Sequence, residues 1–252
     1  MKVKLADFSV VVSDIDYTLV DFGKGHRAAI EALAGIFGRH LADGVGRIFH
    51  LVLEGLRRAE DMDWEERQAF QDMIDQIKRL QAPLLATYGV KPWSREAWII
   101  IAAEQLQMTL TPLQVEEGRD VYWHALGENA TFYDDTPAFL EDIQEVGIPL
   151  VLMTSSDSIC RVTEDHTVTY DPMYSEQYKR ERLSRLPLPY QALVIGDPID
   201  KPDPKFFDKV FHAVARFGDI PMEKILVVGD SDRSDLQEPR QRGCKTLLVT
   251  RD

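Results

Sequence analysis

Short apolar runs, in which hydrophobic and polar positions do not alternate, mark the strands of this chain. Strands with one face in water alternate, whereas parallel strands covered on both faces read as unbroken apolar runs. Such runs occupy residues 8–13, 148–153, 192–195, 225–228 and 246–249. The pattern therefore predicts a buried parallel sheet, with one strand near the N-terminus and four in the second half of the chain.

Helical patterns lie between the later strands. One is predicted from Thr136, as N-cap, with Pro137 in the first position and Gly147 at its end. Two more are predicted at residues 204–217 and 236–242, each followed by a glycine. Strands that alternate with helices favour an α/β fold with a doubly wound, Rossmann-like parallel sheet.

Residues from about 25 to 127 show helical periodicity and no strand pattern. One helix face is formed by Phe70, Met73, Ile74, Ile77 and Leu80, and residues 30–41 and 98–102 have similar spacing. We therefore expect an all-helical domain of residues 22–129, inserted into an α/β domain of residues 1–21 and 130–252. The chain must leave and return at nearby points, which predicts hinges at residues 21–24 and 129–133.

Composition narrows the classes of partner. The 252 residues are 44% hydrophobic and 28% charged, as in ordinary globular proteins. A net charge of −13 argues against a nucleic-acid polymer or a membrane surface as partner, because both require clustered Lys and Arg. The two cysteines, the lack of a signal-peptide pattern and the lack of a transmembrane-length apolar run favour a reduced, cytoplasmic protein.

Polar side chains follow the predicted carboxyl ends of four strands. In chain order they are Asp14 and Asp16, Thr154 and Ser155, Lys201, and Asp230. Each is weak evidence alone, because 42 of 252 residues are acidic and acid pairs arise by chance. Together they lie at one edge of the sheet, where open α/β sheets bind ligands.

This set of residues suits the hydrolysis of a phosphate monoester, which is among the slowest uncatalysed reactions. A carboxylate can divide the reaction into two steps through an aspartyl-phosphate. Asp14 and Asp230 would hold Mg²⁺, and Lys201 would balance the negative charge. The Thr154 hydroxyl and nearby helix N–H groups would bind phosphoryl oxygens, and Asp16 would act as general acid and base.

The four motifs resemble those of the haloacid dehalogenase (HAD) superfamily. The matching segments are Val11-Val12-Ser13-Asp14-Ile15-Asp16-Tyr17-Thr18-Leu19, Leu152-Met153-Thr154-Ser155, Lys201-Pro202-Asp203-Pro204 with Phe206 or Phe207, and Val228-Gly229-Asp230-Ser231 with Asp235. The resemblance implies that Asp14 is the nucleophile and that the backbone carbonyl of Asp16 also meets Mg²⁺. It further implies that Asp235 supports the metal and that the helical insert is a C1-type cap.

Asp16 distinguishes the branches of this superfamily, because dehalogenases lack an acid there: a halide leaving group needs no proton. The resemblance therefore implies a Mg²⁺-dependent phosphomonoester hydrolase acting on a small phosphorylated metabolite. A phosphomutase of the same superfamily and a non-catalytic phosphometabolite-binding relative remain alternatives. Tyr17 departs from the pattern, since many members have Gly there. The sequence does not specify the substrate or the oligomeric state.

Some polar and aromatic residues of the insert have simpler interpretations. The tryptophans are expected in its core, and Arg47 and Arg95 are interpreted as surface charges on helices. His26 is interpreted as a loop residue near the first hinge. Trp64, Trp93, Trp98 and Trp123 are the tryptophans concerned.

Overall fold

The computed structural model describes residues 4–58 and 61–251, which form two compact units. The first, here called the α/β unit, combines Met1–Gly23, Ala130–Ser155 and Leu186–Asp252. The second, here called the helical unit, combines Lys24–Asn129 with Ser156–Arg185.

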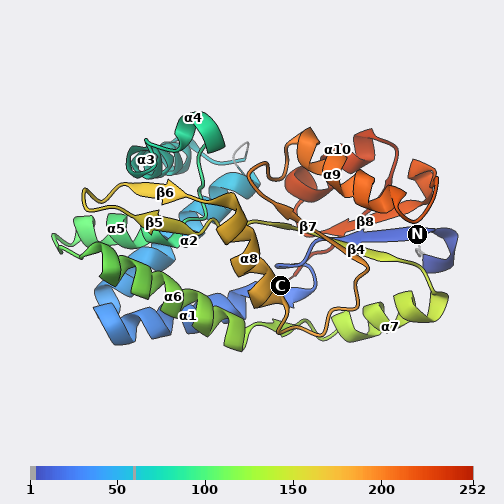
Figure 1. The fold of residues 1–252 in the computed structure, drawn as a ribbon, viewed down its shortest axis with the longest axis horizontal. Helices are drawn as coiled ribbons and strands as arrows, with labels where there is room; N and C mark the ends of the chain where they lie inside the picture. Colours follow the sequence, from blue (N-terminus) through green and yellow to red (C-terminus); the bar gives the residue numbers. More distant parts are fainter. Residues whose placement is uncertain (1–3, 59–60, 252) are drawn as a thin grey trace. The chain divides into compact units, whose positions relative to one another are not determined.

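The α/β unit is built on a five-stranded parallel sheet, which confirms the predicted fold class. The order of its strands is β7-β4-β1-β8-β9, so the chain winds outward from the central β1 in both directions. Helices α9 and α10 lie on one face of the sheet and α7 on the other (Figure 1). The strands are β1 (Val10–Ser13), β4 (Leu150–Ser155), β7 (Ala192–Gly196), β8 (Ile225–Gly229) and β9 (Lys245–Leu248), and the helices are α7 (Thr136–Val146), α9 (Pro204–Ala215) and α10 (Gln237–Gln241).

The central strands β1, β4 and β8 are buried as their apolar runs predict, whereas β9, at the edge of the sheet, is half-buried to exposed. All four residues of β1 and all five of β8 are buried. Phe206 and Phe207 of α9 are fully buried and belong to the same hydrophobic cluster as Val12 and Val151. Each such side chain contributes about 1.5–3 kcal/mol of burial free energy, which anchors α9 and the loop before it to the sheet.

The first segment of the helical unit lies in sequence between β2 (Val20–Asp21) and β3 (Thr131–Phe132), which form a short antiparallel pair. Helix α7 follows β3, and its N-cap is Asp135 rather than the predicted Thr136. The Thr136 hydroxyl instead donates to the carbonyl of Leu19 at 2.8 Å. Thr136 therefore ties the end of the first motif to α7.

The helical unit contains most of the helices. Residues 30–41, which the spacing joined into one helix, are divided between two, because Gly38 adopts a φ of +84° and ends the first. Ser94 caps a later helix, α5, and accepts a hydrogen bond from the N–H of Ala97. No described helix is both long and apolar enough to cross a membrane. The helices are α1 (Phe22–Phe37), α2 (Arg39–Arg58), α3 (Trp64–Leu80), α4 (Leu85–Tyr88), α5 (Arg95–Gln105), α6 (Pro112–Asn129) and α8 (Pro172–Leu183).

Residues 156–185, which the sequence placed in the α/β domain, group with the helical unit. They form a hairpin, β5 (Cys160–Val162) and β6 (Val168–Tyr170), followed by α8. The hairpin pairs only with itself within the described residues, so β5 has an edge without a neighbouring strand. Backbone groups at such an edge need other partners when they are buried.

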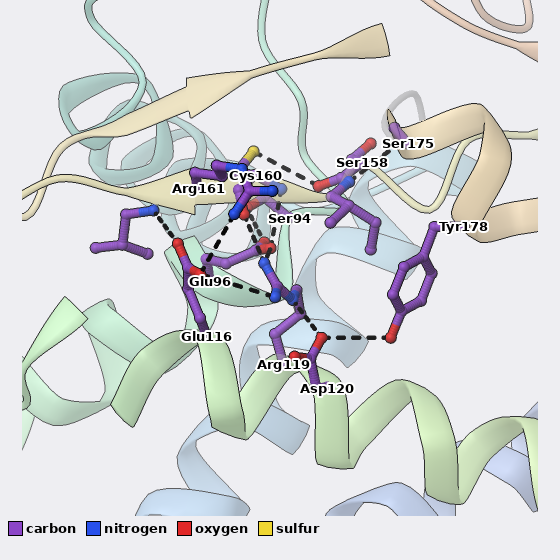
Figure 2. Close-up of polar contacts among 12 residues, drawn as sticks. Ser94, Glu96, Glu116, Arg119, Asp120, Ser158, Cys160, Arg161, Ser175 and Tyr178 are labelled. Carbon is purple, nitrogen blue, oxygen red and sulfur yellow. Dashed lines mark hydrogen bonds and ion pairs between the residues drawn. The ribbon is translucent and has the colours of Figure 1, made fainter. Parts of the chain in front are cut away.

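Side chains of α5 and α6 supply those partners (Figure 2). Glu96 Oε1 accepts a hydrogen bond from the N–H of Cys160 at 2.9 Å, and Arg119 donates to the Cys160 carbonyl at 2.8 Å. Glu116 Oε1 accepts from the N–H of Val162 at 2.9 Å. Glu96 and Arg119 are themselves paired at 3.3 Å and buried. These bonds explain why the hairpin belongs to the helical unit.

Candidate active site

The register of the sheet places Asp14 beside the ends of two neighbouring strands. Ser13 lies opposite Leu152 of β4 and Val228 of β8. The N–H of Asp14 donates to the Val228 carbonyl at 2.9 Å, which fixes the first residue after β1. Since parallel strands end at a common edge, the residues after β1, β4 and β8 are carried to the same place.

Both oxygens of the Asp14 carboxylate are held. Oδ1 accepts a hydrogen bond from Lys201 Nζ at 2.6 Å, and Oδ2 accepts one from the Thr18 hydroxyl at 2.9 Å. Asp14 is only 3% exposed. Lys201 Nζ also donates to Asp235 Oδ1 at 2.7 Å, so one ammonium group links two buried carboxylates.

Asp14, Asp230 and Asp235 form a possible cation site. One oxygen from each lies within 4.8 Å of the others, and the Thr18 hydroxyl lies 3.4 Å from Asp230 Oδ1. A set of carboxylate oxygens fits a hard divalent cation such as Mg²⁺ better than it fits a soft metal. The donor set of this site therefore matches the predicted cofactor.

Asp235 is positioned by a short π-helical turn, η3 (Asp232–Leu236), that follows β8. The N–H of Ser231 donates to Asp235 Oδ2 at 3.0 Å. Gly229 leaves the space that Asp235 occupies, because a Cβ at Gly229 would lie 2.5 Å from Asp235 Cβ. The glycine of the Gly-Asp motif is thus required by the close approach of Asp235.

Burial and the charge of Lys201 shift the pKa of Asp14 in opposite directions. Burial is the main cause that raises the pKa of Asp14 to about 8, and Asp235 and Asp230 raise it further while Lys201 lowers it. Burial alone would lower the pKa of Lys201, but Asp14 and Asp235 raise it above its ordinary value. The lysine therefore stays charged, and the carboxylates that it joins compete for one positive charge.

The remaining predicted site residues lie at the same edge of the sheet. Thr154 and Ser155 end β4 opposite Ile195 and Gly196, and Thr154 is buried. The Thr154 hydroxyl lies 3.4 Å from the Ser155 carbonyl. Among the described residues, it makes no hydrogen bond with the carboxylates of Asp14, Asp230 and Asp235. Asp16 is half-buried, and its backbone bridges to Val20.

The structure gives Thr18 a role that the sequence analysis did not assign. Thr18 lies four residues after Asp14 in the same motif, and a tight turn returns its hydroxyl to that carboxylate. In this turn, Tyr17 adopts a φ of +66°, a left-handed conformation that costs about 1–2 kcal/mol for a non-glycine residue. This conformation explains why a glycine would suit the position.

The helical unit corrects several interpretations. Trp98 and Trp123 are buried as expected, but Trp64 is 74% exposed because it opens α3 directly after the N-cap. Arg95 is not a surface charge: it is 1% exposed, and its guanidinium lies 4.2 Å from the Trp98 ring. His26 is not in a loop but in α1, where it is buried.

Comparison with known proteins places this geometry in a family. The family model for haloacid dehalogenase-like hydrolases matches residues 8–243. A search of curated proteins found no match.

Solved structures share the fold at low identity. A putative β-phosphoglucomutase from Thermotoga maritima has a TM-score of 0.60 and 18% identity over 97% of this chain and 86% of its own. The magnesium-bound putative HAD-hydrolase YfnB from Bacillus subtilis has a TM-score of 0.57 and 13% identity over 96% and 88%. An L-2-haloacid dehalogenase from Xanthobacter autotrophicus, with chloropropionic acid covalently bound, has a TM-score of 0.55 and 14% identity over 97% and 78%.

Proposed function

Because this chain belongs to the haloacid dehalogenase-like hydrolase family, we propose that it is a Mg²⁺-dependent phosphomonoester hydrolase. Its substrate would be a small phosphorylated metabolite, and the reaction would pass through an aspartyl-phosphate on Asp14. The main support is the Asp14 carboxylate itself, which is buried and held on both oxygens by Lys201 and Thr18. A second acid, Asp16, follows it after one residue.

In the first step, an oxygen of Asp14 bonds to phosphorus as the ester bond to the leaving oxygen breaks. Lys201 and Thr18 already fix the carboxylate, so little reorganisation is needed before attack. The Lys201 ammonium also offsets negative charge that develops beside Asp14. Thr154 and Ser155, at the end of β4, are the candidates for binding phosphoryl oxygens.

The proton balance of the reaction requires a second acid. The leaving alkoxide takes a proton from Asp16, and Asp16 then takes a proton from the water that attacks the aspartyl-phosphate. This second step releases phosphate and restores both carboxyl groups. A halide would leave without a proton, so Asp16 favours phosphate ester chemistry over dehalogenation.

Asp14, Asp230 and Asp235 are the residues that would hold Mg²⁺. The cation would supply positive charge that favours the ionised form of Asp14 and reduces its repulsion from phosphoryl oxygens.

The experiment compares Asp14→Asn, Asp16→Asn and a control, Asp232→Asn, on p-nitrophenyl phosphate with Mg²⁺ and with EDTA. Asp232 is exposed and paired with Arg240, so its variant should keep wild-type turnover. Asp14→Asn should abolish turnover without loss of fold, checked by circular dichroism. Asp16→Asn should accumulate the phosphorylated enzyme, detected by intact mass. A folded Asp14→Asn variant with wild-type activity would refute the assignment of the nucleophile.

Assays with natural phosphate esters distinguish the alternatives. A phosphomutase would convert sugar phosphates into isomers with little free phosphate, which product analysis by NMR would detect. A non-catalytic relative would bind phosphorylated metabolites without turnover in any metal. A panel of phosphorylated metabolites, assayed for released phosphate, would also identify the substrate class.

A further inference from the structure

Arg251 lies beside the turn that carries the candidate nucleophile. Its guanidinium donates a hydrogen bond to the backbone carbonyl of Thr18 and forms an ion pair with Asp135 at 2.7 Å. It also lies 4.1 Å from the centre of the Tyr133 ring. The Arg251 side chain is 17% exposed, whereas that of its partner Asp135 is 68% exposed.

Thr18 connects this arginine to Asp14. It is fully buried, and its hydroxyl is the donor to Asp14 Oδ2 at 2.9 Å. Arg251 holds the backbone of Thr18, and the side chain of Thr18 holds the carboxylate. A shift of the Thr18 backbone would therefore move the hydroxyl away from Asp14.

The turn that includes Thr18 needs external support. Tyr17 adopts the left-handed conformation within it, and such residues persist only where surrounding contacts fix them. The turn is closed by hydrogen bonds from the N–H groups of Leu19 and Val20 to the Ile15 carbonyl, at 2.9 and 3.0 Å. Arg251 adds a charged donor on the outer side of the same turn.

We propose that Arg251 is a positioning residue for Asp14, acting through Thr18. The planar guanidinium suits this role, because it contacts the Thr18 carbonyl through one nitrogen and Asp135 through another while its face lies over Tyr133. A lysine has one nitrogen where the guanidinium uses two, and it has no planar group to lie over the ring. The catalytic part of this inference rests on the proposed function.

The chain provides a matched control. Arg242 also pairs with an exposed aspartate, Asp208, at 2.7 Å, donates to a backbone carbonyl, that of Pro204, at 3.1 Å, and lies 5.3 Å from an aromatic ring, that of Phe211. Arg242→Ala therefore removes the same kinds of contact from a different part of the α/β unit.

The activity test uses Arg251→Ala, Arg251→Lys and Arg242→Ala. Arg251→Ala should lower kcat by on the order of 10- to 100-fold, the scale of a small misplacement of a reacting group, with KM little changed. Arg251→Lys should recover part of the loss, and Arg242→Ala should keep wild-type kcat.

A second background tests whether the effect passes through Thr18. In Thr18→Val the hydroxyl is absent, so adding Arg251→Ala should lower kcat by no more than about twofold. An equal loss from Arg251→Ala in both backgrounds would overturn the proposal, as would wild-type kcat in Arg251→Ala.

Hydrogen exchange tests the positioning independently of activity. Amides in a peptide covering residues 15–20 should exchange faster in Arg251→Ala than in the wild type or Arg242→Ala. Unchanged exchange there would refute the support of the turn by Arg251. If the wild type hydrolyses no phosphate ester, the proposed function fails, and the exchange result still decides whether Arg251 holds the turn.

Discussion

Gly229→Ala should damage the site through a single added methyl group. The new Cβ would lie 2.5 Å from Asp235 Cβ and 2.6 Å from Asp235 Oδ2. Ordinary contacts between such atoms are about 3.5–4.0 Å. Asp235 must therefore move by about 1 Å or more, or the backbone of β8 must shift.

Either movement weakens the two hydrogen bonds that position Asp235, from Lys201 at 2.7 Å and from the N–H of Ser231 at 3.0 Å. Overpacking of this kind costs about 1–3 kcal/mol of folding free energy. A 1 Å displacement at a catalytic site can reduce the rate by about 100-fold. We therefore expect Gly229→Ala to lower the unfolding free energy by about 1–3 kcal/mol and kcat by about 100-fold.

The assays are urea unfolding in EDTA, steady-state hydrolysis of p-nitrophenyl phosphate, and calorimetric titration with Mg²⁺, which should bind more weakly. Gly35→Ala is the control, because Gly35 lies inside α1 and a Cβ there has no neighbour within 4 Å. It should stabilise the protein by about 0.5–1 kcal/mol, since alanine favours helix more than glycine does. Wild-type kcat and Mg²⁺ affinity in Gly229→Ala would show that the position of Asp235 does not matter to this site.

Three further predictions concern buried charge. Burial, with contributions from Arg95 and neighbouring groups, lowers the pKa of His26 to about 3. Below the unfolded pKa of about 6.5 only the unfolded chain gains a proton at His26, so the free energy of unfolding should fall by about 2 kcal/mol from pH 6.5 to 5. His26→Gln should remove that part of the pH dependence in urea unfolding, and equal slopes for variant and wild type would contradict it. Lys201→Met should cost about 3–5 kcal/mol in EDTA at pH 8, because the buried carboxylates of Asp14 and Asp235 lose their cation. The cost should be smaller at pH 5, because burial raises the pKa of Asp14 to about 8 and the neutral acid needs no cation; a cost independent of pH would count against this. Glu96→Gln should cost about 1–3 kcal/mol of unfolding free energy by weakening the buried pair with Arg119. The control, Glu104→Gln, weakens an exposed pair with Arg79 and should cost less than about 1 kcal/mol. Equal costs in thermal or urea unfolding would argue against the effect of burial.

The sheet could be predicted because burial on both faces leaves a strong signal in sequence. β8 is apolar except for its final glycine, and every residue in it is buried. The hairpin of β5 and β6 has no such signal, because each strand has three residues and β5 is partnered by side chains of α5 and α6. Glu96 and Arg119 look like surface charges in sequence, and only their distant backbone partners explain their burial.

Part of the candidate site could also be predicted, because several of its residues directly follow strands that are recognisable in the sequence. Asp14, Lys201 and Asp230 each follow a strand, so the rule for the edge of a parallel sheet brings them together. Thr18 could have been found from its spacing to Asp14. Arg251 could not, because it binds a backbone carbonyl, and any residue type provides a carbonyl.

The helical unit is made of two separate segments of the chain, which has a consequence for engineering. Its two segments, Lys24–Asn129 and Ser156–Arg185, are separated by Ala130–Ser155 of the α/β unit, so the chain passes between the units four times. Transplanting residues 24–129 alone into another scaffold would leave Glu96 and Arg119 facing the space where the Cys160 backbone should be. A modular exchange of this unit must therefore carry both segments, and chimaeras joined at residues 23 and 130 alone should be insoluble or unstable.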